Sequence, residues 1–135
     1  MDEPMDKAMG NRVLVVFHTS EGQTARIADR IGDVLRAAGD TVDVVAVDEA
    51  PDVSKYDAVV LGDSIHVGHY SHAFSRYVKA NAVTLNAMPT ALFQVSLVSA
   101  NPDAEHAATA HTLVQKLLDD TGLDPDIVGM FAGAL

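Results

Sequence analysis

The chain has 135 residues and a mass of 14.3 kDa, which is typical of one domain, and 48% of its residues are hydrophobic, enough to build a core. Its 9 lysines and arginines stand against 19 acidic residues, and the resulting net charge of −10 argues against a nucleic-acid partner and against adsorption to an anionic membrane. Because there is no cysteine, disulfides, thiolate metal centres and a thiol nucleophile are excluded, and redox chemistry would need a bound cofactor.

The first residues differ in character from the rest of the chain. Residues 1–11 are polar and acidic, without the basic-then-apolar order of a signal peptide, and we expect them to form a flexible segment before a domain over 12–135. No apolar run reaches the roughly 18 residues that would predict a membrane span. We therefore expect a cytoplasmic protein.

Strand and helix patterns alternate along the chain. Continuous runs of β-branched and apolar residues predict buried strands over 12–17, 41–47, 58–62, 90–96 and 127–132. Apolar residues at helical spacing predict helices over 24–38, 74–85 and 110–118. This alternation predicts an open, doubly wound α/β domain, a parallel sheet with helices on both faces. The link 48–57 contains Pro51 and several acids, and we expect a loop or a single helical turn there.

The fifth predicted strand ends three residues before Leu135. In this architecture a fifth strand normally carries a final helix back over the sheet, and that helix is missing from this sequence. We expect some apolar sheet surface to lack its own cover, so that a partner covers it, the sheet is rearranged, or the chain is a fragment of a longer protein. A homo-oligomer is one expected consequence.

The loop after the first strand has the composition of a phosphate site. In open α/β sheets, ligands bind beyond the carboxyl ends of the strands, and this loop, HTSEGQT over 18–24, runs directly into a helix. Hydroxyls, a glycine and the N–H groups of a helix start form a neutral cradle for a phosphate. The alternative is an ordinary turn with Ser/Thr capping. Without a lysine the loop suits a monophosphate, and neither GxGxxG nor GxxxxGK[ST] occurs where a nucleotide motif requires it.

The loops after the third and fourth strands could complete a ligand site. The first of them, DSIHVGHY over 63–70, offers flat or polarisable side chains suited to a planar heterocycle. His66, His69 and His72 suggest a metal site as the alternative, but their spacing is not that of a helical pair, and Asp63 is the one nearby carboxylate. The other loop, over 96–102, is short and polar, with an Asn-Pro pair suited to starting a helix.

In these three loops the sequence resembles the flavodoxin-like superfamily. TSEGQT over 19–24 is similar to its FMN phosphate loop, T/S-x-T-G-x-T, except that Glu21 stands where a threonine is usual. A closer resemblance is to the quinone-dependent protoporphyrinogen dehydrogenase family of haem synthesis. It is carried by FHTSEGQT over 17–24, LGDSIHVGHYSHAF over 61–74, LNAMP over 85–89, VSLV over 95–98 and AGAL over 132–135.

The resemblance implies a five-stranded flavodoxin-like sheet of order 2-1-3-4-5 that binds FMN, with the chain short at its C-terminal end. The phosphate would be held by Thr19, Ser20, Glu21, Gly22, Gln23 and Thr24. The isoalloxazine would be lined by Ser64, Ile65, His66, Val67, Gly68, His69 and Tyr70 and, at its other edge, by Ser96, Leu97 and Val98. Family members pass electrons from protoporphyrinogen IX to a membrane quinone, and the resemblance assigns no acid/base residue.

Three functions remain open at this point. The first is an FMN oxidoreductase acting on a porphyrinogen, with a quinone or a protein as electron acceptor. The second is a short flavodoxin that carries electrons between proteins, for which the acidic surface would steer basic partners. Flavodoxins usually place aromatics against the flavin from the second and third loops, and since Tyr70 is the single aromatic in those loops, the first function is favoured. The third is a flavin-free scaffold.

Overall fold

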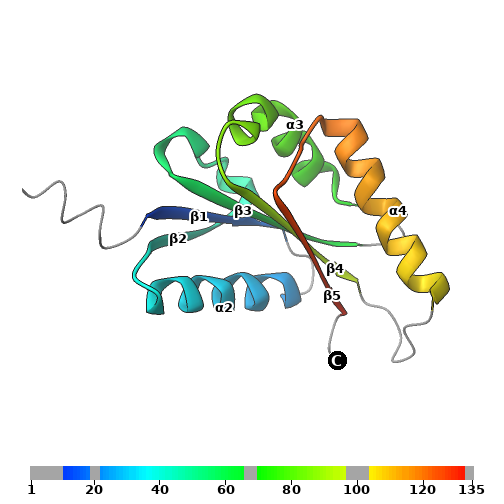
Figure 1. The fold of residues 1–135 in the computed structure, drawn as a ribbon, viewed down its shortest axis with the longest axis horizontal. Helices are drawn as coiled ribbons and strands as arrows, with labels where there is room; N and C mark the ends of the chain where they lie inside the picture. Colours follow the sequence, from blue (N-terminus) through cyan, green and yellow to red (C-terminus); the bar gives the residue numbers. More distant parts are fainter. Residues whose placement is uncertain (1–10, 19–21, 66–69, 97–103, 133–135) are drawn as a thin grey trace, which may run out of the picture.

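The computed structural model describes residues 11–18, 22–65, 70–96 and 104–132 (Figure 1). Residues 1–10 of the expected N-terminal segment lie outside this part. The described strands form one parallel sheet of order β2-β1-β3-β4-β5, which confirms the predicted topology. They are β1 (Arg12–Phe17), β2 (Thr41–Ala46), β3 (Ala58–Ile65), β4 (Thr90–Ser96) and β5 (Ile127–Ala132). The α-helices are α2 (Gln23–Ala37), α3 (His72–Asn86) and α4 (Ala104–Thr121).

The helices cover the two faces of the sheet (Figure 1). On one face α2 packs through Ala28 against Val13 and Val15 of β1. On the other face Phe74 of α3 and Leu117 of α4 belong to a core that continues into β1, β3 and β4. The central strands β1, β3 and β4 are therefore buried on both sides, which explains why their sequences are largely apolar.

The ends of the helices follow local sequence signals. After α2, Gly39 has φ 105°, and its N–H donates to Arg36 O while Asp40 N–H donates to Leu35 O, a Schellman ending that favours glycine. At the start of α3 the Ser71 hydroxyl accepts from Phe74 N–H at 3.1 Å. Both residues are of types that favour these positions, glycine after a helix and serine before one.

The predicted third strand was too short. β3 continues through Asp63, Ser64 and Ile65, which stay in register with Gln94, Val95 and Ser96 of β4. The sequence prediction ended the strand at 62 because a polar pair follows the apolar run, but the pairing with β4 extends the strand. In the link 48–57 the chain forms two short 3₁₀ turns, η1 (Val47–Glu49) and η2 (Val53–Lys55), as expected for a segment without a crossover helix.

The edge strand β5 exposes apolar side chains. Ile127 is 65% exposed and Phe131 is 41% exposed, although the Phe131 ring contacts Phe93 edge-on with centroids 5.9 Å apart. Apolar sheet surface thus lies open at this edge in the described part of the chain, and its cover by a second copy stays a prediction. No helix in that same part is long and apolar enough to cross a membrane.

Candidate cofactor site

The three predicted loops leave the sheet at one edge. β1 ends at Phe17, β3 at Ile65 and β4 at Ser96, and these strands are neighbours and parallel, so their carboxyl ends lie together. Of the predicted site residues, the structure describes Gly22, Gln23, Thr24, Ser64, Ile65, Tyr70 and Ser96. Outside the described residues lie Thr19, Ser20, Glu21, His66, Val67, Gly68, His69, Leu97 and Val98.

The first turn of α2 contains a buried threonine hydroxyl, that of Thr24. Gly22 is the N-cap at φ 87°, a backbone conformation that favours glycine, and it supplies no side chain to cap the first turn. That turn contains no acidic residue. Thr24 within it is 0% exposed, and its buried hydroxyl has no hydrogen-bond partner among the described residues. Because a buried hydroxyl without a partner is costly, this position favours an anion held at the helix start.

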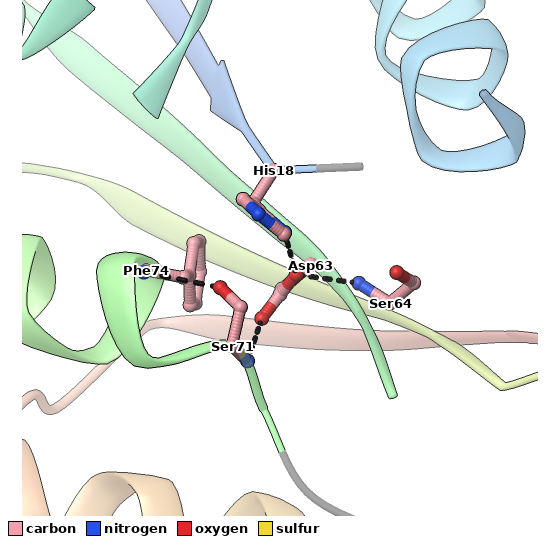
Figure 2. A network of polar contacts seen from close by, with 5 residues as sticks. All are labelled: His18, Asp63, Ser64, Ser71 and Phe74. Atoms are coloured by element: carbon pink, nitrogen blue, oxygen red, sulfur yellow. Dashed lines mark hydrogen bonds and ion pairs between the residues drawn. The ribbon is translucent and has the colours of Figure 1, made fainter. Parts of the chain in front are cut away.

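A second polar centre lies at the carboxyl end of β3 (Figure 2). The Asp63 side chain is 0% exposed, and its Oδ1 accepts from Ser64 N–H at 2.8 Å. Its Oδ2 accepts from Ser71 N–H at 2.8 Å, immediately before α3. From the end of β1, His18 Nδ1 lies 3.2 Å from Asp63 Oδ1, and the His18 side chain is 26% exposed. One buried carboxylate therefore connects the ends of β1 and β3 to the start of α3.

Burial and hydrogen bonding act on Asp63 in opposite directions. Desolvation raises the pKa of its carboxyl above the ordinary 3.8, whereas the Ser71 N–H, the charge of His18 and the Ser64 N–H lower it. The net pKa shift is upward, so burial dominates. The three contacts compensate only part of the cost of placing a carboxylate in the sheet.

Tyr70 and Ser96, both predicted to line a flavin, are connected by side-chain hydrogen bonds through Gln94. The Tyr70 hydroxyl donates to Gln94 Oε1 at 2.5 Å, and Gln94 Nε2 donates to Ser96 Oγ at 3.2 Å. Tyr70 is 8% exposed, and its ring stacks on Phe74 at 5.9 Å between centroids. Burial raises the pKa of the Tyr70 phenol, so the hydroxyl stays a donor at neutral pH. Contact of Tyr70 with a flavin remains a prediction.

The sequence analysis placed His18 and Asp63 in the loops 18–24 and 63–70 without assigning them to the cofactor, and it did not single out Gln94. Gln94 is a polar residue inside the predicted strand 90–96, and Asp63 directly follows the predicted strand 58–62, so both could have been recognised. His18 lies one residue beyond β1, on the face that also carries Val16. The described residues contain no group of three or more potential metal ligands, and His66 and His69 lie outside them.

Comparison with known proteins identifies the class. The profile of the flavodoxin domain family matches residues 14–135, and the chain belongs to this family. Among solved structures, a flavodoxin from Bacillus cereus superposes with a TM-score of 0.65 at 21% identity, covering 92% of this chain and 86% of that one. A flavoprotein in complex with FMN from Lactobacillus acidophilus gives a TM-score of 0.62 at 13% identity, covering 90% and 93%. These two structures agree with the fold.

Sequence relatives of known function point to one group within this family. Protoporphyrinogen IX dehydrogenase [quinone] of Escherichia coli K12 is 38% identical over 126 residues, covering 92% of this chain and 69% of the relative. The protein of the same name from Leishmania major is 36% identical over 128 residues. The chain spans 54% of that longer relative. Within the flavodoxin domain family, this chain is therefore a sequence relative of the protoporphyrinogen dehydrogenases.

Proposed function

We propose that the chain binds FMN at the carboxyl edge of the sheet and acts as an FMN-dependent oxidoreductase on a porphyrinogen. The single observation that carries the cofactor assignment is the buried Thr24 hydroxyl, which has no partner in the described part of the chain. It lies in the first turn of α2, where the partial positive charge of the helix favours a phosphate. Relatives 38% identical and named protoporphyrinogen IX dehydrogenase [quinone] support the reaction.

The residues at this edge fit a flavin mononucleotide. Gly22 leaves space beside the backbone, since a Cβ placed there would meet no atom of the described residues within 4 Å, and the first turn of α2 has no carboxylate to repel a phosphate. Ser64, Ile65 and Ser96 lie at the ends of β3 and β4, where the ring system would be held. When bound, FMN supplies the acceptor of two electrons. The chain's own part is to orient the ring and limit access to it.

The proposal also names the class of electron donor and of electron acceptor. By relationship to the curated relatives, the electrons come from a porphyrinogen and leave to a quinone or a protein acceptor. No described side chain stands out as the acid or base, so the proposal assigns none. A cytoplasmic location and a homo-oligomer also remain predictions.

Anaerobic reduction of the bound flavin tests the reaction. Protein loaded with FMN is mixed with protoporphyrinogen IX without oxygen, and the visible flavin absorbance is followed. We expect bleaching that depends on porphyrinogen, followed by recovery when a quinone is added. The same FMN without protein is the control for direct reaction. Flavin that stays oxidised in the protein at saturating porphyrinogen would contradict this function for the chain.

The alternative is an electron carrier, which the net charge of −10 favours. An acidic carrier would be steered to basic partners, and its reduction rate by a reductase would fall steeply as salt rises. A reduction rate that does not change with salt, together with porphyrinogen-dependent bleaching, supports the enzyme. A salt-sensitive rate without such bleaching supports the carrier.

A further inference from the structure

The buried carboxylate of Asp63 is connected to several elements. Its two oxygens accept from Ser64 N–H within β3 and from Ser71 N–H at the start of α3, each at 2.8 Å. Ser64 is the first residue of the segment predicted to line the isoalloxazine, and Ser71 directly follows its last residue. Since a carboxylate with two backbone partners is held firmly, Asp63 fixes the distance between the two ends of this segment.

The third contact of Asp63, with His18, connects it to the predicted phosphate loop. His18 is the residue immediately before the predicted phosphate loop, and its ring lies 3.2 Å from Asp63 (Figure 2). The His18 backbone is itself held in place, because its N–H donates to Gly62 O at 3.0 Å and continues the pairing of β1 with β3. The phosphate and ring loops are thus joined through one side chain that is 0% exposed.

We propose that Asp63 is a positioning residue of the cofactor site, holding the ends of the two loops together, and that His18 is its partner at the end of β1. This inference rests on the proposed function, because it assigns these two residues to the binding of FMN. Neither side chain is required to touch the cofactor. The expected consequence is an FMN affinity that depends on the charge of Asp63.

The direction of the pH dependence follows from the contacts. Protonation removes the charge and occupies one oxygen with hydrogen, so one of the two backbone bonds is weakened or lost. Because burial raises the pKa of Asp63 above 3.8, FMN affinity should fall as pH falls through that raised value. The described titratable side chains that interact with Asp63 are His18 from β1 and Tyr70 before α3. From β4, the residue in register with it is the neutral Gln94.

The test is the dissociation constant of FMN, measured by quenching of its fluorescence, from about pH 8 to about pH 4.5. We expect Asp63→Asn to bind FMN roughly tenfold or more weakly at the upper pH, because its amide cannot accept both N–H groups. The FMN affinity of this variant should also vary less with pH, because it lacks the carboxylate that titrates in the wild type. Circular dichroism at each pH reports whether the proteins remain folded.

His18→Gln provides a test that does not remove the carboxylate. Because the His18 contact lowers the pKa of Asp63, its removal raises that pKa further, so FMN affinity should begin to fall at a higher pH than in the wild type. A purely structural role for His18 would not move this profile. The FMN phosphate titrates in every variant, so its effect cancels in the ratio to wild type.

Asp57→Asn is the matched control. Asp57 also accepts a backbone N–H, from Arg12 at 2.8 Å, but at the amino end of the sheet and exposed to solvent. The Asp57→Asn variant should leave the pH dependence of FMN affinity unchanged. The inference is overturned if Asp63→Asn keeps the wild-type affinity and profile, or if the His18→Gln profile coincides with the wild type. Failure of the wild type to bind FMN at about pH 8 would instead refute the proposed function.

Discussion

A Phe74→Ala variant is expected to lose about 3–5 kcal/mol of unfolding free energy, the usual cost of removing a fully buried aromatic ring. Phe74 is 0% exposed and lies in the core between α3 and the sheet. Its ring also stacks on Tyr70, with planes 15° apart. The variant would therefore leave a cavity and remove the support of Tyr70. Urea denaturation followed by circular dichroism measures the loss.

The control for this variant lies on the same helix. Val83 is 87% exposed, so Val83→Ala should change the unfolding free energy by no more than about 0.5 kcal/mol. A domain of this size has a total stability of about 5–15 kcal/mol, so Phe74→Ala would be marginally folded or unfolded at 37 °C. A loss below about 1 kcal/mol would show that α3 does not pack on the sheet as described.

A Thr24→Val variant is expected to separate cofactor binding from stability. Valine keeps the shape of threonine and removes the hydroxyl, which is buried without a partner among the described residues. The cofactor-free protein should be as stable as the wild type or more stable by about 1 kcal/mol, because an unsatisfied polar group is gone. FMN affinity should fall roughly 10- to 100-fold, since a hydrogen bond to a charged phosphate is lost.

Both quantities are measured on the same preparations, FMN affinity by fluorescence quenching and stability by urea denaturation without FMN. Thr84→Val, at an exposed position of α3, is the control for the substitution itself. The account of the phosphate site would be contradicted if Thr24→Val bound FMN as the wild type does. A destabilised protein with unchanged FMN affinity would show that the hydroxyl has a structural role.

The strands were predictable because each carries a largely apolar run, and the central strands β1, β3 and β4 are buried on both faces. The largely apolar run 90–96 coincides with β4 over the same residues. Turn residues were equally informative, as Gly39 and Ser71 show. The order 2-1-3-4-5 came from the resemblance, since periodicity alone gives the elements but not which strands are neighbours.

The interactions of the site were harder to predict. The environment of Asp63 is made by His18, 45 residues away along the chain, and by Ser71, 8 residues away. A polar residue after an apolar run indicates a strand end, so its position inside β3 depended on the pairing with β4. Likewise, the phosphate motif includes Thr24, but only the folded arrangement shows that its hydroxyl is buried without a described partner.

The measurement that tests the central claim most directly is a titration of the purified protein with FMN, followed in the visible spectrum. We expect one FMN per chain, a flavin spectrum altered from that of free FMN, and a melting temperature that rises with FMN concentration. A colourless protein that unfolds cooperatively, takes up no FMN and shows no such rise would contradict the assignment of this sheet edge as a flavin site.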